Sequence, residues 1–410
     1  MTALKRIVVV PDGMADHPQA RLGGKTPVEA AHTPHLDRIA RGGTVGLVTT
    51  VPDGMAAGSD VANLSVLGYD PAALYTGRAP LEAAGLGVRL AAADVAYRCN
   101  LVTIVDGAIR DPTAGHLPTA EAGRLVELLN RRVGPPFEFH AGTSFRCLMV
   151  WRGGREARTT PPQDIVGQAL DGFLPQGEAG AALRELTSRA ARVLDGGHPL
   201  VTGIWLWGGG RSPSLPAFFA MRGLSAVVVA AAQLVRGIGV CAGCEAPIVP
   251  GATAYIDTDY AAKARTALAA LRRHDLAFIH IEAPDEASHL KSLAEKIRAI
   301  EAIDREILGR IGRELPDAAV LVVPDHYTSV ASGLHEALAV PFAYGAAKGG
   351  PAFAVDGNGA DGGPSAPRGV APDGWRPARA FGEAQAAQTG LELPSGAALM
   401  DLFSGCTARR

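Results

Sequence analysis

The sequence predicts an α/β protein: a mostly parallel sheet sandwiched by helices, with a second, smaller α/β domain inserted. Three short apolar runs end in polar turn residues, at 6–13, 277–286 and 319–326, as is typical of strands buried in a parallel sheet. Amphipathic helical patterns lie between them, and such alternation favours helices on both faces of the sheet. The length of 410 residues exceeds the size at which one hydrophobic core stops growing, which favours more than one domain.

The elements follow from these patterns in order. RIVVVPDG at 6–13 is expected to be a buried strand, and TPHLDRIARGG at 33–43 a helix. AFIHIEAPDE at 277–286 and AVLVVPDH at 319–326 are expected to be two further buried strands. The segment at 292–315 is expected to be one long helix, because apolar residues recur there at intervals of three and four. These residues are Leu293, Ile297, Ile300, Ile303, Ile307 and Ile311.

The middle of the chain has strand and helix patterns of its own. VAYRCNLVTIV, AEAGRLVELLNRRV, FRCLMVW and SAVVVAAAQLV follow one another between the first acidic strand and the two later ones. We therefore predict an inserted domain at 94–244, within a discontinuous domain formed by 1–93 and 245–410. The Gly-, Pro- and Ala-rich segment at 345–374 cannot bury much apolar surface and is expected to be an irregular surface loop.

Composition and charge describe an ordinary water-soluble globular protein. Apolar residues make up 47% of the chain, charged residues 20%, and the formal net charge is -2, so nothing in the overall charge suggests a nucleic-acid-binding protein. No segment reaches the roughly twenty consecutive apolar residues of a membrane-spanning helix, and the first residues lack the apolar core of a signal peptide. We expect a cytoplasmic protein that binds neither nucleic acid nor membrane.

The five cysteines are an odd number in a chain without a secretion signal, which predicts reduced thiols rather than a disulfide framework. Cys241 and Cys244 form a C-x-x-C motif. This motif can be a redox pair, half of a zinc site, or two small apolar residues in a linker. The lack of a second C-x-x-C favours the linker interpretation.

Carboxylate and imidazole side chains gather where the predicted strands end. They are Asp12, Asp285, His289, Asp325, His326 and His335. Asp285 and His289 are four residues apart, so a helical turn would place both on one side. Any one of these residues alone is explained by a helix cap or a surface group. Together they suit Mn²⁺ or Zn²⁺ better than Ca²⁺, and two ions about 3.5 to 4 Å apart form a clamp for in-line phosphoryl transfer.

Ser59 is the candidate nucleophile. It follows Gly58 and precedes an apolar helix that starts near Val61. At such a position the helix dipole and free N–H groups favour an alkoxide and a transferred phosphate. The alternative is an ordinary helix cap, for which Asp60 competes. A neighbouring metal ion favours the nucleophile, because coordination activates a hydroxyl group.

Ten segments together carry a family resemblance. They are VVPDGMAD, LGGKTPVEAAHTPHLDRIA, GSDVANLSVLGYDP, YTGRAPLEA, YRCNLVT, TTPPQDIVG, GIWLWGGG, PGATAYIDTDY, EAPDEASH and VPDH. In this order the chain resembles the archaeal-type cofactor-independent (2,3-bisphosphoglycerate-independent) phosphoglycerate mutases of the alkaline phosphatase superfamily. The resemblance covers nearly the whole chain except the Gly-rich segment. It implies an alkaline-phosphatase-like catalytic domain that binds metal, at 1–93 and 245–410, and an inserted substrate-binding domain at 94–244.

The resemblance also implies roles for individual residues. Asp12, Ser59, Asp325 and His326 would hold one divalent ion, and Asp285, His289 and His335 the other. Ser59 would be both ligand and nucleophile, forming a phosphoserine. The ions would be Mn²⁺, Zn²⁺ or Mg²⁺, and no bisphosphoglycerate would be needed.

The inserted domain would supply the contacts to a small phosphorylated hydroxy-acid substrate. The candidates are Arg98, Asp111, His116, Arg146, Asp164 and Arg211. Arginine suits phosphate and carboxylate because its guanidinium donates two parallel hydrogen bonds. For each residue taken alone, a surface ion pair or structural hydrogen bond is an equal explanation.

Three segments depart from the family pattern. SHLKS at 288–292 stands where the family has G-H-x-G-D, Gln163 replaces a histidine, and SGLHEALAVPF at 332–342 differs around His335. None removes a predicted metal ligand. The first hypothesis is interconversion of 3-phosphoglycerate and 2-phosphoglycerate. The alternatives are a divergent member acting on another small hydroxy acid, such as a homoserine kinase-like enzyme or a specialised-metabolism mutase, and a metal-dependent phosphatase.

Overall fold

The computed structural model of the chain describes residues 4–350 and 377–405. The chain divides into two compact units, which are described separately. Unit 1 comprises Met1–Tyr75 and Leu215–Arg410, and unit 2 is Thr76–Ser214. Among the described residues, no helix is long and apolar enough to span a membrane.

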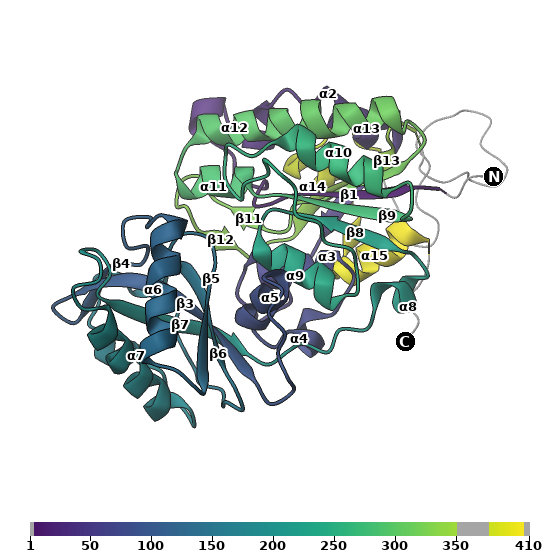
Figure 1. The fold of residues 1–410 in the computed structure, drawn as a ribbon. Helices are drawn as coiled ribbons and strands as arrows, with labels where there is room; N and C mark the ends of the chain where they lie inside the picture. The colour runs from purple at the N-terminus through teal and green to yellow at the C-terminus, as the bar shows by residue number, and fades with distance from the viewer. Residues whose placement is uncertain (1–3, 351–376, 406–410) are drawn as a thin grey trace. The chain divides into compact units, whose positions relative to one another are not determined.

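In the described part of the chain, unit 1 contains a seven-stranded sheet with the strand order β14-β2-β13-β10-β1-β9-β8 (Figure 1). The strands are β1 (Arg6–Pro11), β2 (Thr44–Val48), β8 (Ala226–Val229), β9 (Leu276–Ile281), β10 (Ala319–Val322), β13 (Val340–Ala346) and β14 (Glu392–Leu393). The pairs β8/β9, β9/β1, β1/β10 and β2/β14 are parallel, whereas β13 is antiparallel to both β10 and β2. The predicted α/β class with a mostly parallel sheet is confirmed.

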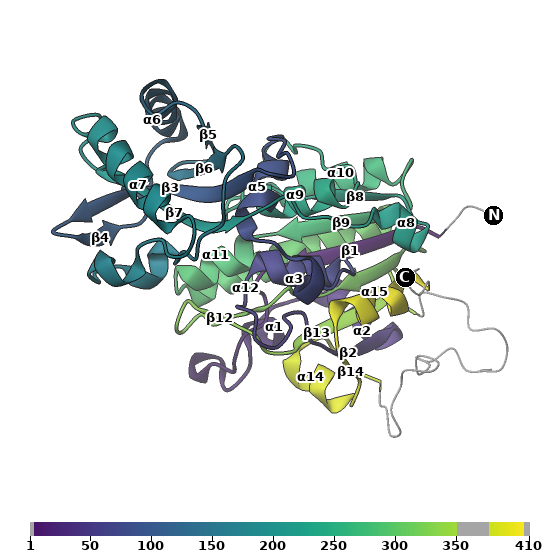
Figure 2. The same cartoon turned by 90° about the horizontal axis from the view of Figure 1, so that it is seen from below.

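Helices cover both faces of this sheet. On one face lie α2 (Pro34–Gly42), α10 (Tyr260–Ala270), α12 (Leu293–Ala302), η4 (Ile303–Leu308) and α13 (Gly309–Glu314) (Figure 1). Figure 2 shows the opposite face, with α3 (Ser59–Val66), α9 (Gln233–Cys241) and α15 (Gly396–Ser404). Shorter elements are η1 (Ala20–Leu22), α1 (Pro27–Ala30), α4 (Pro71–Leu74), α8 (Phe218–Arg222), α11 (Ala283–His289), α14 (Glu383–Gln388) and the β-hairpin of β11 (Tyr327–Thr328) with β12 (His335–Glu336).

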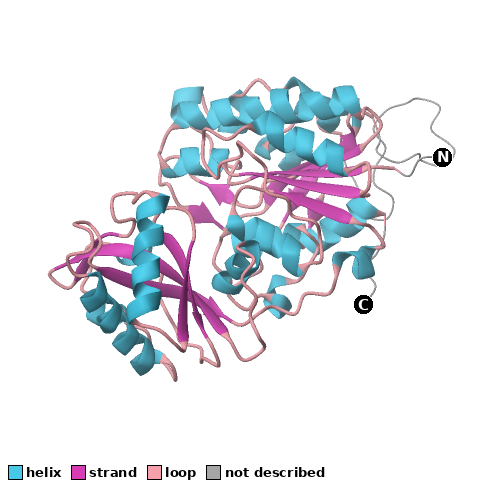
Figure 3. Cartoon of the chain, in the orientation of Figure 1, coloured by secondary structure: helices cyan, strands magenta, loops and turns pink. Residues whose placement is uncertain are grey.

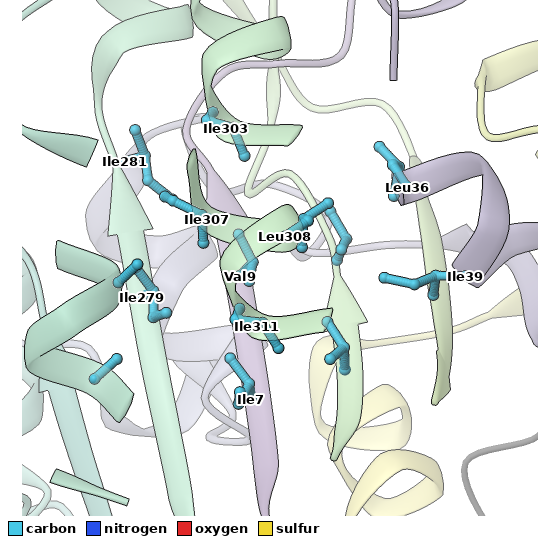
Figure 4. Packing of buried hydrophobic residues seen from close by; sticks show 14 of the residues in the cluster. Ile7, Val9, Leu36, Ile39, Ile279, Ile281, Ile303, Ile307, Leu308 and Ile311 are labelled. Carbon is cyan, nitrogen blue, oxygen red and sulfur yellow. The ribbon is translucent and has the colours of Figure 1, made fainter. Parts of the chain in front are cut away.

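The core between the sheet and its first helix layer is aliphatic. Alternate residues of β1 and β9, including Ile7, Val9 and Ile279, pack against Ile307 and Ile311 (Figure 4). The predicted long helix is therefore found, but its middle, η4, is a π-helix. Within η4 the buried Asp304 accepts hydrogen bonds from the backbone N–H groups of His35 and Leu36, at 3.1 and 2.8 Å. The three- and four-residue apolar spacing of this helix does not show that Asp304 caps the distant helix α2.

Unit 2 has its own antiparallel sheet. Its strands are β3 (Val95–Val105), β4 (Ala108–Asp111), β5 (Phe137–Ala141), β6 (Arg146–Trp151) and β7 (Gly203–Gly210). The helices α6 (Thr119–Arg132) and α7 (Gly180–Leu194) pack against one face (Figures 1 and 3). The remaining elements are α5 (Arg78–Gly85), η2 (Pro162–Ile165) and η3 (Leu170–Phe173).

The compact units divide at other residues than the predicted domains at 94 and 244. Helix α5 joins unit 2, because Ala79 and Ala83 pack against Ala96 and Val150. Strand β8 joins unit 1, because it pairs in parallel with β9. Both assignments depend on packing partners far away in the sequence. Of the predicted loop at 345–374, residues 345 and 346 end β13, and 351–374 lie outside the described residues.

Candidate active site

Three neighbouring parallel strands deliver acidic side chains to one edge of the unit 1 sheet. Asp12 follows β1 directly, Asp285 lies in α11 after β9, and Asp325 follows β10. All three carboxyl groups are buried. This is the carboxyl edge of the parallel strands, where ligands bind in open α/β sheets.

Ser59, Asp325 and His326 lie around Asp12. The Ser59 Oγ is 3.4 Å from Asp12 Oδ2 and 3.4 Å from His326 Nε2. His326 Nε2 is also 3.4 Å from Asp12 Oδ1 and 3.6 Å from Asp325 Oδ2. Gly58 occupies the N-cap of α3 and Ser59 is the first helical residue, so the Ser59 hydroxyl faces this cluster instead of serving as the cap.

The second cluster contains Asp285, His289 and His335. His289 Nε2 is 3.1 Å from both Asp285 Oδ2 and His335 Nε2, and His335 Nε2 is 3.3 Å from Asp285 Oδ1. His289 Nδ1 lies 2.9 Å from the Gly333 carbonyl oxygen. Because that oxygen can only accept, Nδ1 carries a hydrogen, so Nε2 is the nitrogen that could bind a cation beside Asp285 and His335 after losing its own proton.

These side chains fit divalent cations. The ligand atoms of Asp12, Asp325 and His326 lie within 4.8 Å of one another, as do those of Asp285, His326 and His335. The family resemblance assigns His326 to the first ion, whereas its geometry places it within reach of both sets. Asp12 Oδ1 is buried and has no hydrogen-bond partner among the described residues. A buried carboxylate oxygen that lacks a donor and lies beside imidazole nitrogen is suited to Mn²⁺ or Zn²⁺.

Negative charge accumulates on the Asp12 side of the site. Burial raises the pKa of Asp12 well above its usual value, and the neighbouring charges of Asp325 and Asp285 raise it further. Burial also favours the neutral form of Asp285, but His289 and His335 outweigh this and hold its pKa well below the usual range. The hydrogen bond with Asp285 raises the pKa of His289 to about 9, although burial opposes the shift. A bound cation would offset the repulsion around Asp12.

Sequence reasoning missed the residues that hold these ligands in place. Asn63 donates a hydrogen bond of 2.8 Å to Asp325 Oδ2 and one of 2.9 Å to the Ser59 carbonyl oxygen. Thr328 Oγ1 donates to Asp285 Oδ1 over 2.6 Å. Asn63 lies four residues after Ser59 on the same helix, and this spacing is the one signal that could have identified it.

The six substrate candidates all lie in unit 2. Asp111 accepts hydrogen bonds from the backbone N–H groups of Thr113 and Gly115, at 2.7 and 2.6 Å. His116 and Arg146 both contact Phe145, the His116 ring at 6.0 Å and the Arg146 guanidinium at 4.6 Å. Asp111 thus ends β4, His116 lies in the loop after it, and Arg146 begins β6.

The other three candidates are placed differently. Arg98 stacks 4.5 Å from the Trp207 ring and is 3.1 Å from Glu82. Arg211 donates to the carbonyl oxygens of Ala92 and Gly154, each over 3.2 Å. Asp164 lies in η2, and burial raises its pKa. The contacts that Arg98 and Arg211 make within the protein suffice to explain why arginine occurs at both positions. Their contact with a substrate therefore stays a prediction.

The C-x-x-C motif lies at the carboxyl end of α9, with Cys241 as its last residue. Both thiols are free, and burial raises the pKa of Cys241 to about 11 and that of Cys244 to about 12. A reactive cysteine needs a lowered pKa. The raised pKa values argue against a redox pair, and Cys241 belongs to helix α9, whereas the sequence suggested a linker.

Known proteins share both the sequence and the fold. Residues 40–200 match the family model described as 2,3-bisphosphoglycerate-independent phosphoglycerate mutase. The chain is 46% identical over 359 residues to the probable 2,3-bisphosphoglycerate-independent phosphoglycerate mutase of Geobacter sulfurreducens, across 83% of this chain and 90% of the relative. The chain belongs to this family. The mutase of Methanothrix thermoacetophila is 45% identical over 355 residues, with the same two coverages. Mutases are isomerases, so the predicted family and enzyme class are confirmed.

Two solved structures share the fold of this chain. A protein of Pyrococcus horikoshii has a TM-score of 0.78 and 25% identity over 98% of both chains. The cofactor-independent phosphoglycerate mutase of Thermoplasma acidophilum has a TM-score of 0.61 and 23% identity, over 98% of this chain and 99% of that one. This second likeness shows a shared fold.

Proposed function

We propose that this mutase interconverts 3-phosphoglycerate and 2-phosphoglycerate without 2,3-bisphosphoglycerate, by two-metal phosphoryl transfer through a phosphoserine at Ser59. The observation that supports it is the position of the Ser59 hydroxyl, 3.4 Å from both Asp12 Oδ2 and His326 Nε2 at the start of α3. The mutases of Geobacter sulfurreducens and Methanothrix thermoacetophila, 46% and 45% identical to this chain over 83% of its length, support the same activity.

The steps follow from the residues present. Ser59 Oγ bonds to phosphorus, the bond from phosphorus to the glycerate oxygen breaks, and the hydroxyl proton of Ser59 ends on that oxygen. The other hydroxyl of the same glycerate then bonds to phosphorus, the bond from phosphorus to Ser59 Oγ breaks, and the proton of that hydroxyl returns to Ser59 Oγ. When bound, two divalent ions would supply positive charge to the transferring group and lower the pKa of the Ser59 hydroxyl. The free N–H groups at the start of α3 favour the same negative charge.

Two further parts of the proposal concern the ligands and the substrate side. Asp12, Asp325 and His326 would hold one Mn²⁺, Zn²⁺ or Mg²⁺ ion with Ser59, and Asp285, His289 and His335 the other. The unit 2 residues Arg98, Asp111, His116, Arg146, Asp164 and Arg211 are the candidates for contacts with the glycerate and its phosphate.

The test is 2-phosphoglycerate formation by metal-reconstituted protein given 3-phosphoglycerate and no bisphosphoglycerate. We expect turnover by the unmodified chain and a loss of about 10³-fold or more in Ser59→Ala. Ser65→Ala is the control, because Ser65 lies on the same helix but accepts a hydrogen bond from the Gly396 N–H instead. Full activity in Ser59→Ala would refute the assignment of Ser59 as the nucleophile.

The products decide between this activity and its alternatives. Free phosphate released in place of the isomer would establish a phosphatase. Transfer confined to another small hydroxy acid would establish a divergent member, and the departures at 288–292 and Gln163 make that assay a necessary companion.

A further inference from the structure

A buried histidine lies directly behind Asp12. His280 is fully buried at the end of β9, beside Val10 of β1. Its Nε2 is 3.2 Å from Asp12 Oδ2, and its Nδ1 is 3.4 Å from Glu282 Oε1. The imidazole thus lies between two carboxylates, one of which belongs to the proposed metal site.

Glu282 is itself held by several groups. Its Oε1 accepts hydrogen bonds from the backbone N–H groups of Ala231 and Ala232, at 3.1 and 2.7 Å. Its Oε2 contacts the fully buried Lys263 Nζ at 2.5 Å, and Lys263 also donates to the His280 carbonyl oxygen over 2.9 Å. The carboxylate beyond His280 is therefore fixed by α10 and by the start of α9.

The fold does not require a histidine at this place. Ala277, Ile279 and Ile281 of the same strand enter the aliphatic core, and an apolar residue at 280 would complete the strand without burying polar atoms. Buried ionisable groups cost free energy relative to apolar residues of similar volume. A chain of four such groups that ends at Asp12 points to a role at the site.

We propose that His280, anchored by Glu282, is a positioning residue that orients Asp12 for metal binding. This inference rests on the two-metal site of the proposed function. Asp12 Oδ2 faces His280 Nε2 and the Ser59 hydroxyl, whereas Asp12 Oδ1 is the buried oxygen without a hydrogen-bond partner among the described residues, 3.4 Å from His326 Nε2. Neither His280 nitrogen meets hydrogen-bond geometry with a partner among the described residues, so the 3.2 Å contact is electrostatic. It keeps Oδ2 beside the imidazole and leaves Oδ1 facing the ion, as groups behind metal ligands commonly do.

The test is a titration of metal-free protein with Mn²⁺ alone, with free Mn²⁺ measured by electron paramagnetic resonance. His280→Leu fills the space without a nitrogen, and His280→Gln places an amide N–H where Nε2 lies. The matched control is His274→Gln, which removes another histidine–glutamate contact (2.7 Å to Glu245) at the opposite end of β9. We expect His280→Leu to weaken one of the two Mn²⁺ sites by about 10- to 100-fold, His280→Gln to recover most of that loss, and His274→Gln to bind as the unmodified chain does.

Two results would overturn the inference: His280→Leu binding both ions with unchanged affinity, or His280→Gln binding no better than His280→Leu. If His280→Leu does not fold, the shorter amide in His280→Asn replaces it, and equal binding by the Asn and Gln variants overturns the inference. The titration contains no substrate, so it tests the role of His280 separately from the activity. If the unmodified chain binds two ions but shows no mutase turnover, the proposed activity is refuted and the role of His280 is not.

Discussion

At the scale of single residues, Gly13 allows the two groups of proposed metal ligands to lie close to each other. It has φ +58, in the left-handed region that favours glycine, and its N–H donates to Asp325 Oδ1 over 3.0 Å. A Cβ at this position would lie 2.4 Å from Thr328 Oγ1 and 2.5 Å from Asp285 Oδ1. A side chain at this position therefore has to displace a proposed metal ligand.

Gly13→Ala is expected to weaken Mn²⁺ binding and to destabilise the metal-free protein. The left-handed conformation costs about 1–2 kcal/mol for an alanine, and overpacking adds about 1–3 kcal/mol. Gly23→Ala is the control, because Gly23 has φ +66 and an added Cβ meets nothing within 4 Å. Urea unfolding and Mn²⁺ titration measure both effects. Equal behaviour of the two variants would show that the close approach at Gly13 has no consequence.

The sequence predicted the proposed metal ligands better than it predicted the residues that hold those ligands in place. Asp12, Asp285 and Asp325 were recognisable because each follows an apolar run, and such runs can be read locally. His280 lies inside one of these runs. Its partner Glu282 is two residues further along, but Asp12 and Lys263 come from other elements, so the local sequence does not show that His280 lies behind Asp12. Lys291, where the family pattern has a glycine, has φ +54, in the left-handed region that favours glycine.

At the scale of elements, a buried lysine ties α12 to two loops of the active-site edge. Lys296 Nζ is fully buried, 2.8 Å from Asp16 Oδ2 and 2.7 Å from the Thr328 carbonyl oxygen. Asp16 follows β1, and Thr328 belongs to β11 and donates to Asp285. The ion pair of Lys296 with Asp16 thus helps to position Thr328, which donates to the proposed metal ligand Asp285.

Lys296→Met is expected to lower the free energy of unfolding by about 3–5 kcal/mol, because it leaves the Asp16 carboxylate buried without its cation. The double variant Lys296→Met/Asp16→Asn should recover part of this loss, since no buried charge then remains unpaired. Lys348→Met, which removes the exposed pair with Asp317, should change stability by about 1 kcal/mol or less. Chemical denaturation checks all three, and a Lys296→Met loss no larger than that of Lys348→Met would contradict the argument.

Sequence patterns found elements more readily than their pairing. The strands β1, β9 and β10 and the helices α2 and α6 lie where the periodicity predicts them. The antiparallel course of β13 and the place of β8 beside β9 depend on neighbours hundreds or tens of residues away, which apolar runs do not specify. The π-helix η4 escaped prediction because a three- and four-residue apolar spacing does not distinguish a π-helical turn from the α-helix on either side of it.

At the scale of the whole molecule, the proposed chemistry divides between the units. Every proposed metal ligand and Ser59 lie in unit 1, and every substrate candidate lies in unit 2. Unit 2 is one continuous segment with an apolar core between its sheet and the helices α6 and α7. Its ends are adjacent, because Thr76 Oγ1 donates to the Arg211 carbonyl oxygen over 2.7 Å.

Thr76–Ser214 expressed alone is therefore expected to fold cooperatively. It should bind Mn²⁺ much more weakly than the full chain does, because it lacks the proposed metal ligands. Trp205 and Trp207 are buried within it, so their fluorescence should report a single transition in urea that overlays the loss of far-ultraviolet circular dichroism. The full chain with Asp12→Asn and Asp285→Asn is the control for the loss of metal binding without loss of unit 1. A gradual transition would show that unit 2 needs unit 1 to fold. Tight Mn²⁺ binding by the isolated segment would instead show that Asp12 and Asp285 are not the metal ligands.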